Sequence, residues 1–211
     1  GIHLQGAGRC SPLIRTHKTL SRGDGMFWPK HDMRSKLLSG EIDLAELKHE
    51  FAAQITKFLS TGFTPTHMDS HHHIHLYPGV GDLLLELGNE FGIKKIRVPL
   101  EPLPPAKDVS ADRMSQLKFY HQSATALKDK AAKARFKTTD FFRGLNLGDN
   151  FDENTAAHLF GSLENGVTEI MTHPGFADPN EGGFSGAKRE TELQTLLGDK
   201  TARILNDQQV H

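Results

Sequence analysis

The run from His67 to His75 is the part of the sequence best suited to chemistry. It reads His-Met-Asp-Ser-His-His-His-Ile-His and contains five of the chain's 13 histidines. A lone histidine is most often an ordinary hydrogen-bonding residue, but neutral imidazole is also the commonest protein ligand for divalent metals. A nearby carboxylate, here Asp69, can hold the second ring N–H of a ligand. This density of imidazoles therefore predicts a metal centre.

The side chains of this run divide between two faces if the chain is extended, because successive residues of a strand point to opposite sides. His72 and Ile74 would share one face. The other face would carry the remaining histidines and the aspartate, namely His67, Asp69, His71, His73 and His75. Asp69 could bind the metal, orient a ligand imidazole or act as a general base, and spacing does not separate these roles.

Two further positions, His173 and Arg97, are candidates for the same chemistry. His173 opens a His-Pro-Gly turn directly after the apolar run 167–172. It is either part of a capped turn or an imidazole that donates a proton to a leaving amine or alkoxide. Arg97 stands in an otherwise apolar segment, either as an ion-pair partner or as an anchor for a carboxylate or a sugar oxygen.

The elements that must position these residues alternate between short apolar runs and amphipathic segments. Strands are expected near 66–70, 95–99 and 167–172, helices near 43–61, 78–91, 112–135, 153–163 and 193–197, and a glycine-rich loop at 178–186. This alternation predicts an α/β fold with mostly parallel strands. Ligands bind at the carboxyl ends of such strands, and both histidine motifs follow predicted strands directly.

The first two predicted helices carry recognisable end signals. Asp43 is an expected N-cap, Glu46 completes a capping box, and Gly62 follows the end of the helix. Pro78 is expected to open the next helix, where its missing N–H costs nothing, and Gly92 to close it.

Length and composition limit the remaining function classes. A chain of 211 residues is expected to form one domain over 1–211, and 25 basic against 26 acidic residues argue against a nucleic-acid partner. Cys10 is the only cysteine, so no intramolecular disulfide can form, and a cytoplasmic location is expected. No apolar run approaches the roughly 20 residues of a membrane span, so a membrane is not an expected partner.

The two ends and the missing motifs add two expectations. The chain begins at Gly1, and Ile2-His3-Leu4 already has the character of a strand. We therefore expect a domain that is truncated at the N-terminus and slightly at the C-terminus. A Gly-x-Ser-x-Gly elbow and a glycine-rich phosphate loop are absent from the sequence, which argues against serine hydrolases and nucleotide-dependent enzymes.

Four motifs in this order resemble those of the YdjC-like carbohydrate deacetylases, a family that includes the chitooligosaccharide deacetylases. They are Gly1-Ile2-His3-Leu4, Thr66 to His75, Ile96-Arg97-Val98-Pro99, and Glu169-Ile170-Met171-Thr172-His173-Pro174-Gly175. The resemblance covers nearly the whole chain. The His-x-Asp-Ser-His-His-His-x-His run is highly specific, and the other motifs add weight through their order and spacing.

The resemblance implies a deformed (β/α) barrel of the polysaccharide-deacetylase type and removal of acetyl groups from a small N-acetylated carbohydrate. A divalent metal, Mg²⁺ or Zn²⁺, would be held by His3 and His71. His173 would protonate the leaving amine, Asp69 would orient a ligand imidazole, and Arg97 would position the substrate or a catalytic carboxylate. A homodimer is left open.

The sequence departs from the family pattern at one motif. The family's third metal ligand is the aspartate of an Asn-Ala-Asp-Asp-Phe-Gly motif, which this sequence does not contain, so that ligand and the general base cannot be assigned here. Two alternatives therefore stay open. One is another metal hydrolase, such as a phosphoesterase on a similar barrel, and the other is a non-catalytic protein that binds a metal or a sugar.

Overall fold

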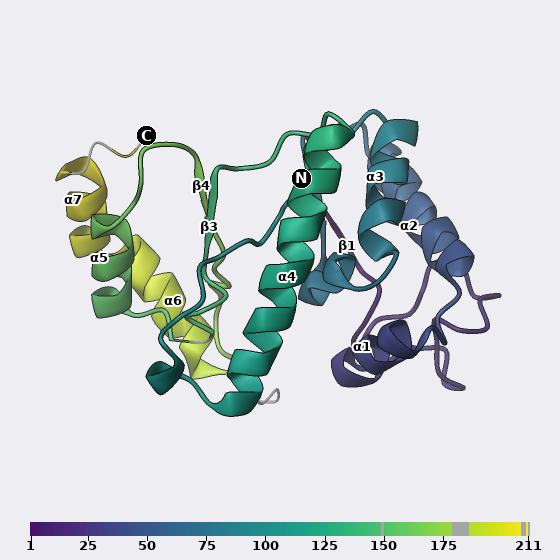
Figure 1. Ribbon diagram of the computed structural model, residues 1–211, viewed down its shortest axis with the longest axis horizontal. Helices are drawn as coiled ribbons and strands as arrows, with labels where there is room; N and C mark the ends of the chain where they lie inside the picture. Colours follow the sequence, from purple (N-terminus) through teal and green to yellow (C-terminus); the bar gives the residue numbers. More distant parts are fainter. Residues whose placement is uncertain (149, 179–185, 208–209, 211) are drawn as a thin grey trace. The chain divides into compact units, whose positions relative to one another are not determined.

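The protein is a mixed α/β structure in which helices accompany short pairs of parallel strands (Figure 1). The computed structural model describes residues 1–148, 150–178, 186–207 and residue 210. The chain divides into two compact units. The first combines residues 1–99 with 119–138, and the second combines residues 100–118 with 139–211. None of the helices in the described part of the chain combines the length and apolarity that crossing a lipid bilayer requires.

The first unit is built around two parallel strands that lie far apart in sequence. Strand β1 (Ile2–Leu4) pairs with β2 (Met68–Ser70), and His3 lies opposite Asp69 in this register. A parallel bridge from Met68 to Ile96 brings the next segment alongside. The elements around the pair are α1 (Lys30–Ser39), α2 (Leu44–Leu59), the 3₁₀ segment η1 (His71–Leu76), α3 (Val80–Glu90) and the second half of α4 (Ala111–Lys133).

The core of this unit forms where the apolar faces of α2 and α3 meet the strand pair. Its fully buried side chains include Leu4, Leu47, Phe51, Ile55, Met68, Ile74, Leu84 and Leu87. Helix α3 packs closely on β2 because Gly88 carries no side chain: a Cβ there would lie 2.4 Å from the Met68 side chain. The periodic apolar stripes of α2 and α3 therefore fix the strands whose ends carry the histidine run.

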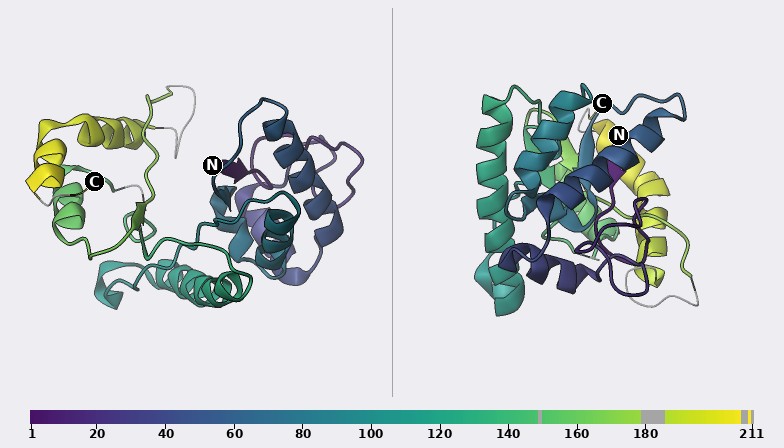
Figure 2. Two further views of the ribbon diagram at one scale, coloured as in Figure 1. Left: turned by 90° about the horizontal axis from the view of Figure 1, so that it is seen from above. Right: turned by 90° about the vertical axis from the view of Figure 1, so that its right-hand side faces the viewer.

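The second unit repeats the parallel pairing on a smaller core. Strand β3 (Phe141–Arg143) pairs with β4 (Thr168–Ile170). Helices α5 (Glu153–Gly161), α6 (Ala187–Leu197) and α7 (Asp199–Asp207) lie beside one another in Figures 1 and 2. Their core is formed by Phe151, Ala156, Leu159 and Phe160. A 3₁₀ turn, η2 (Ala106–Asp108), lies in the proline-rich segment.

The predicted helices are confirmed, with shifted ends. The helix after Pro78 begins at Val80 rather than at the proline, because Gly79 takes the N-cap position with a φ of 77°. The strand predicted over 95–99 is wrong in extent, since Lys95 and Ile96 form only isolated bridges. Helices α1 and α7 and strand β3 were not predicted. Most of the predicted glycine-rich loop at 178–186 lies outside the described residues.

The predicted capping box of α2 is also wrong in part. Asp43 is the N-cap and accepts a hydrogen bond from the N–H of Ala45, as expected. However, the N–H of Asp43 donates to the Thr19 hydroxyl instead of to Glu46. The Glu46 carboxylate accepts from the N–H groups of Lys18 and Thr19. A long-range contact has replaced the local one, and it ties the loop after β1 to α2.

Candidate active site

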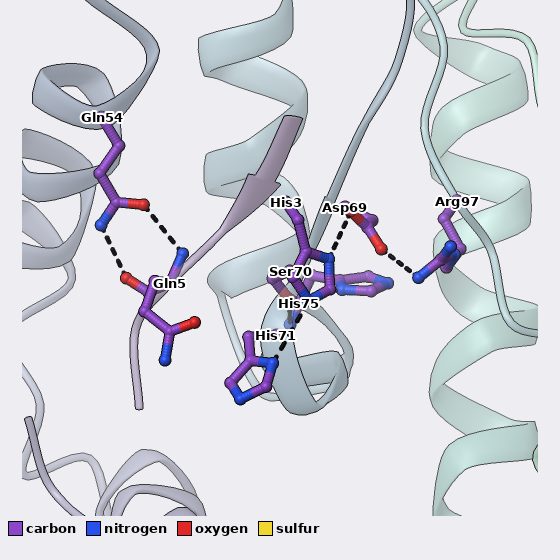
Figure 3. Close-up of polar contacts among 8 residues, drawn as sticks. All are labelled: His3, Gln5, Gln54, Asp69, Ser70, His71, His75 and Arg97. Atoms are coloured by element: carbon purple, nitrogen blue, oxygen red, sulfur yellow. Dashed lines mark hydrogen bonds and ion pairs between the residues drawn. The ribbon is translucent and has the colours of Figure 1, made fainter. Parts of the chain in front are cut away.

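The parallel register of β1 and β2 brings His3 and Asp69 into direct contact. His3 Nδ1 lies 2.8 Å from Asp69 Oδ1, and the second carboxylate oxygen accepts a hydrogen bond from the Arg97 guanidinium (Figure 3). The backbone N–H of Arg97 donates to the Met68 carbonyl at 3.1 Å, which places the arginine beside β2. Of the two roles predicted for Arg97, the structure shows the ion pair.

The Asp69 carboxylate is charged in this setting. The residue is 4% exposed, and burial by itself disfavours the ionised form. The hydrogen bond from His3 and the positive charge of Arg97 outweigh that burial, so the pKa of Asp69 lies below its usual value. A carboxylate that accepts the Nδ1–H of His3 leaves the lone pair of this imidazole on Nε2.

His3 and His71 approach each other although 68 positions separate them, as the family resemblance implied. His3 Nε2 lies 3.3 Å from His71 Nδ1, and the two rings are nearly perpendicular at 81°. Two imidazole nitrogens, each about 2.0–2.1 Å from one tetrahedral metal ion, would be about 3.3 Å apart. The geometry of the pair and the carboxylate behind His3 thus fit a metal site.

Two imidazoles are fewer ligands than a catalytic metal site usually has. Within the described ranges of the chain, no three side chains of the His, Cys, Asp and Glu types are grouped so that they could hold a metal ion. Catalytic metal sites usually have three protein ligands and an open position. The residues present therefore offer two imidazole nitrogens, oriented by Asp69.

The extended conformation predicted for the histidine run holds only as far as Ser70. Beyond it the chain turns into η1, in which His72 and His73 take left-handed backbone angles with φ of 57° and 54°. This conformation costs roughly 1–2 kcal/mol for each residue that is not glycine. The predicted alternation of side chains from His71 to His75 is therefore wrong. The His72 ring lies against that of His71, with centroids 3.7 Å apart, instead of pointing to the opposite face.

The later histidines of the run form part of the packed interior. His73 and His75 are 8% and 1% exposed. The Ser70 hydroxyl oxygen lies 2.6 Å from His75 Nδ1 and accepts the His75 backbone N–H at 3.0 Å, which closes the turn (Figure 3). Burial lowers the pKa of His75 to about 4, and burial together with the proximity of the His71 ring lowers that of His72 to about 3. These imidazoles are therefore neutral at physiological pH.

The segment after His3 is held by the Gln54 side chain, whose amide makes the two backbone hydrogen bonds that a neighbouring strand would make. The Gln54 amide oxygen accepts the backbone N–H of Gln5 at 2.8 Å, and the amide nitrogen donates to the Gln5 carbonyl at 2.7 Å (Figure 3). The Gln54 nitrogen also donates to Glu50, whose carboxylate accepts the backbone N–H groups of Leu13 and Ile14. Helix α2 thereby anchors both the end of β1 and the loop that follows it.

His173 belongs to the second unit, where it follows β4 as predicted. Its backbone N–H donates to the buried Glu192 carboxylate at 2.5 Å, and its carbonyl accepts from Arg189 Nε at 3.1 Å. The Gly175 N–H donates to the Arg189 carbonyl, and a Cβ on Gly175 would lie 2.7 Å from the Arg189 guanidinium. Helix α6 therefore fixes the backbone of the His-Pro-Gly turn.

The structure thus groups four of the five predicted site residues, His3, Asp69, His71 and Arg97, in the first unit. Sequence reasoning missed the residues that support them. Gln54 is a polar residue beside the apolar stripe of α2, and this position could have identified it from the sequence as a supporting residue. Glu192 and Arg189 lie three residues apart on α6 and could have been found only by their contacts.

The sequence model of the YdjC-like protein family matches residues 1–207, and the chain belongs to this family. A carbohydrate deacetylase from Thermoanaerobacter pseudethanolicus is 29% identical over 100% of this chain and 74% of its own length. One from Danio rerio is 28% identical over 92% of this chain and 72% of its own length.

A protein of known crystal structure has a fold similar to that of this chain. It comes from Enterococcus faecalis and is provisionally described as a cellobiose-phosphate cleavage protein. This structure superposes with a TM-score of 0.71 over 99% of this chain and 73% of that one, at 21% identity.

Proposed function

We propose that this protein is a carbohydrate deacetylase, a hydrolase that removes the acetyl group from an N-acetylated sugar. Membership of the YdjC-like family and the similarity to proteins named carbohydrate deacetylases support this activity. The observation that carries the proposal is the approach of His3 Nε2 to His71 Nδ1 at 3.3 Å, with Asp69 bonded to the far nitrogen of His3. Two oriented imidazoles at the end of a strand pair suit a hydrolytic centre.

We further propose that His3 and His71 hold a divalent metal ion. Ligand chemistry favours Zn²⁺ for imidazole nitrogens, whereas Mg²⁺ prefers oxygen and retains its waters. When bound, the ion would polarise the acetyl carbonyl and make a water molecule more acidic. Asp69 would keep the Nδ1–H of His3 in place, and Arg97 would keep Asp69 ionised.

The reaction also needs a proton at the departing nitrogen. Water adds its oxygen to the acetyl carbon, the C–N bond breaks, acetate leaves, and the sugar amine must gain a proton. We assign that proton to the His173 imidazole. Its place directly after β4, at the carboxyl end of a parallel strand, supports the assignment.

The two parallel strand pairs are, in this proposal, elements of a deformed (β/α) barrel of the polysaccharide-deacetylase type. The parallel pairing β1–β2 and β3–β4 and the similarity to the Enterococcus faecalis structure support it. A barrel would also explain why residues that act together come from the ends of separate strands.

The proposal is tested by acetate release from N-acetylglucosamine oligosaccharides. Activity should fall after treatment with a chelator and return with Zn²⁺ or Mg²⁺. His71→Ala should abolish activity and metal binding, whereas His158→Ala, an exposed histidine of α5, should leave both unchanged. p-Nitrophenyl phosphate serves as the counter-substrate. Phosphate release without acetate release would assign the protein to the phosphoesterases instead.

A further inference from the structure

Arg34 lies on α1, far from the histidine run in sequence, yet it contacts the left-handed turn of that run. The residue is 8% exposed, and its Nη2 donates to the His72 carbonyl at 3.0 Å. The guanidinium carbon lies 6.0 Å from the centroid of the Tyr77 ring and 5.6 Å from that of Tyr120. Across the described part of the chain, no carboxylate lies within ion-pair distance of Arg34, and its buried Nε lacks a hydrogen-bond partner.

A buried guanidinium without a carboxylate is unfavourable, so its presence requires an explanation. The two tyrosine rings compensate part of the charge through cation–π contacts. The remaining contact is with the carbonyl of His72, which belongs to the peptide group between His72 and His73. Both residues that flank this peptide have positive φ. The hydrogen bond from Arg34 therefore acts on the plane of the peptide at the centre of the turn.

This turn decides where the His71 ring lies. The reversal at His72 and His73 ends the extended chain directly after β2 and places the His72 ring 3.7 Å from that of His71. On the other side, His71 Nδ1 faces His3. If the turn relaxed to an ordinary right-handed or extended conformation, the His72 ring would leave its place against His71, and the His71 ring would lose that contact.

We propose that Arg34 is a positioning residue for the deacetylation proposed above. By holding the His72 carbonyl, it fixes the left-handed turn and presents His71 Nδ1 to His3 Nε2. The expected effect of Arg34 on kcat rests on the proposed function, whereas its effect on the turn does not. Arg34 contacts a carbonyl and two aromatic rings rather than the His3–His71 pair, so its action is indirect.

The test is a double-mutant cycle of Arg34→Met and His72→Gly. Glycine adopts positive φ without the steric cost of other residues, so a turn with glycine at 72 should no longer depend on Arg34. In the wild-type background Arg34→Met should lower kcat about 10–100-fold with little change in KM for the sugar. In the His72→Gly background the same substitution should have a much smaller effect.

The matched control is Lys36→Met on the same helix, whose cation lies over Trp28 and pairs with Glu41. It should leave kcat close to wild type. An equal loss of kcat from Arg34→Met in both backgrounds, or no loss in either, overturns the proposal. If Arg34→Met does not fold, Arg34→Leu, which also lacks a donor, replaces it in the same cycle, and Arg34→Lys, which keeps the charge and can still donate, should retain most of kcat.

A second measurement is independent of turnover. Long-range ¹H–¹⁵N spectra of the metal-free protein report on the histidine rings directly. Arg34→Met should move the ring signals of His3 and His71 in the wild-type background but not in the His72→Gly background, and unmoved signals overturn the proposal. If the wild-type protein releases no acetate, the proposed function has failed, and these spectra still decide the role of Arg34.

Discussion

The turns that follow β2 and β4 both place a histidine just beyond a parallel strand, but they are held in different ways. In the first, the contacts reach rings as well as backbone: Asp69 holds the His3 ring, Ser70 holds that of His75, and Arg34 holds the His72 carbonyl. In the second, the contacts from Glu192 and Arg189 on α6 act on the backbone of His173. A substitution in the first turn should therefore disturb several rings at once. In the second, the imidazole can be removed while the contacts that hold the turn remain.

The largest expected effect tests the second turn. His173→Ala should keep the fold, because the contacts to Glu192 and Arg189 involve the backbone, and should lower kcat on an N-acetyl sugar by about 10²–10⁴. An ester with a good leaving group needs little protonation, so the same variant should be much less impaired on it. Steady-state kinetics on the two substrates, together with thermal unfolding, check this. Similar losses on both substrates with a lowered Tm would mean that His173 is structural.

The next effect tests the first turn. Asp69→Asn removes the charge that holds the Nδ1–H of His3 and leaves Arg97 without its carboxylate partner. We expect activity and Zn²⁺ affinity to fall about 10–100-fold, the usual result of removing a carboxylate behind a ligand histidine. Calorimetric titration with Zn²⁺ and acetate release measure the two losses. Asp82→Asn, which breaks an exposed ion pair with Lys130, is the control and should change neither.

The third effect concerns the buried histidine of the first turn and its response to pH. Burial lowers the pKa of His75 to about 4, whereas in the unfolded chain the value is about 6.5. Below about pH 6.5 the unfolded state therefore binds a proton that the folded state does not. The contribution of His75 to stability is complete above that pH and should fall by about 1.4 kcal/mol per pH unit as the pH drops toward 4.

Urea unfolding of the chelator-treated protein between about pH 7 and pH 5 measures the loss of stability, of which His75 should contribute about 2 kcal/mol. Burial also lowers the pKa values of His72 and His73, so the wild-type protein should lose more than this. His75→Gln should reduce the slope by the contribution of His75, because a neutral amide takes up no proton. His158→Ala, which removes an exposed histidine, should leave the slope as in the wild type. A slope that His75→Gln does not change would show that His75 is not held neutral by the fold.

The elements were predictable from regular geometry, whereas the pairing of His3 with His71 was implied by the family resemblance. The periodic stripe of Leu47, Phe51 and Ile55 identifies α2, and strands that end at one edge of a parallel pair bring their ends together. The left-handed turn was not predictable. His72 and His73 carry no local signal for positive φ, which is normally a property of glycine. Long-range contacts hold these residues in that conformation, and a single sequence does not display them.

The same limit explains why the residues that hold the histidine run in place were not predicted. Helix α1 has too few apolar positions to show a period, so Arg34 could not be connected with the histidine run. The predicted capping box at Glu46 failed for a related reason, since the loop at Lys18 and Thr19 supplies donors that the local pattern ignores. Local rules located the strand ends, whereas distant residues determine the geometry beyond them.

The smallest expected effect returns to the second turn. Glu192→Gln keeps the shape and an acceptor oxygen for the His173 N–H but removes the charge, so the free energy of unfolding should fall by about 1 kcal/mol. Glu190→Gln changes an exposed residue of the same helix and should have no such effect. Urea unfolding and kcat are measured on both variants. A loss of kcat as large as that of His173→Ala, without loss of stability, would show that Glu192 acts on the chemistry of the imidazole. The contrast between a turn in which contacts also hold the histidine rings and one held only through its backbone would then be wrong.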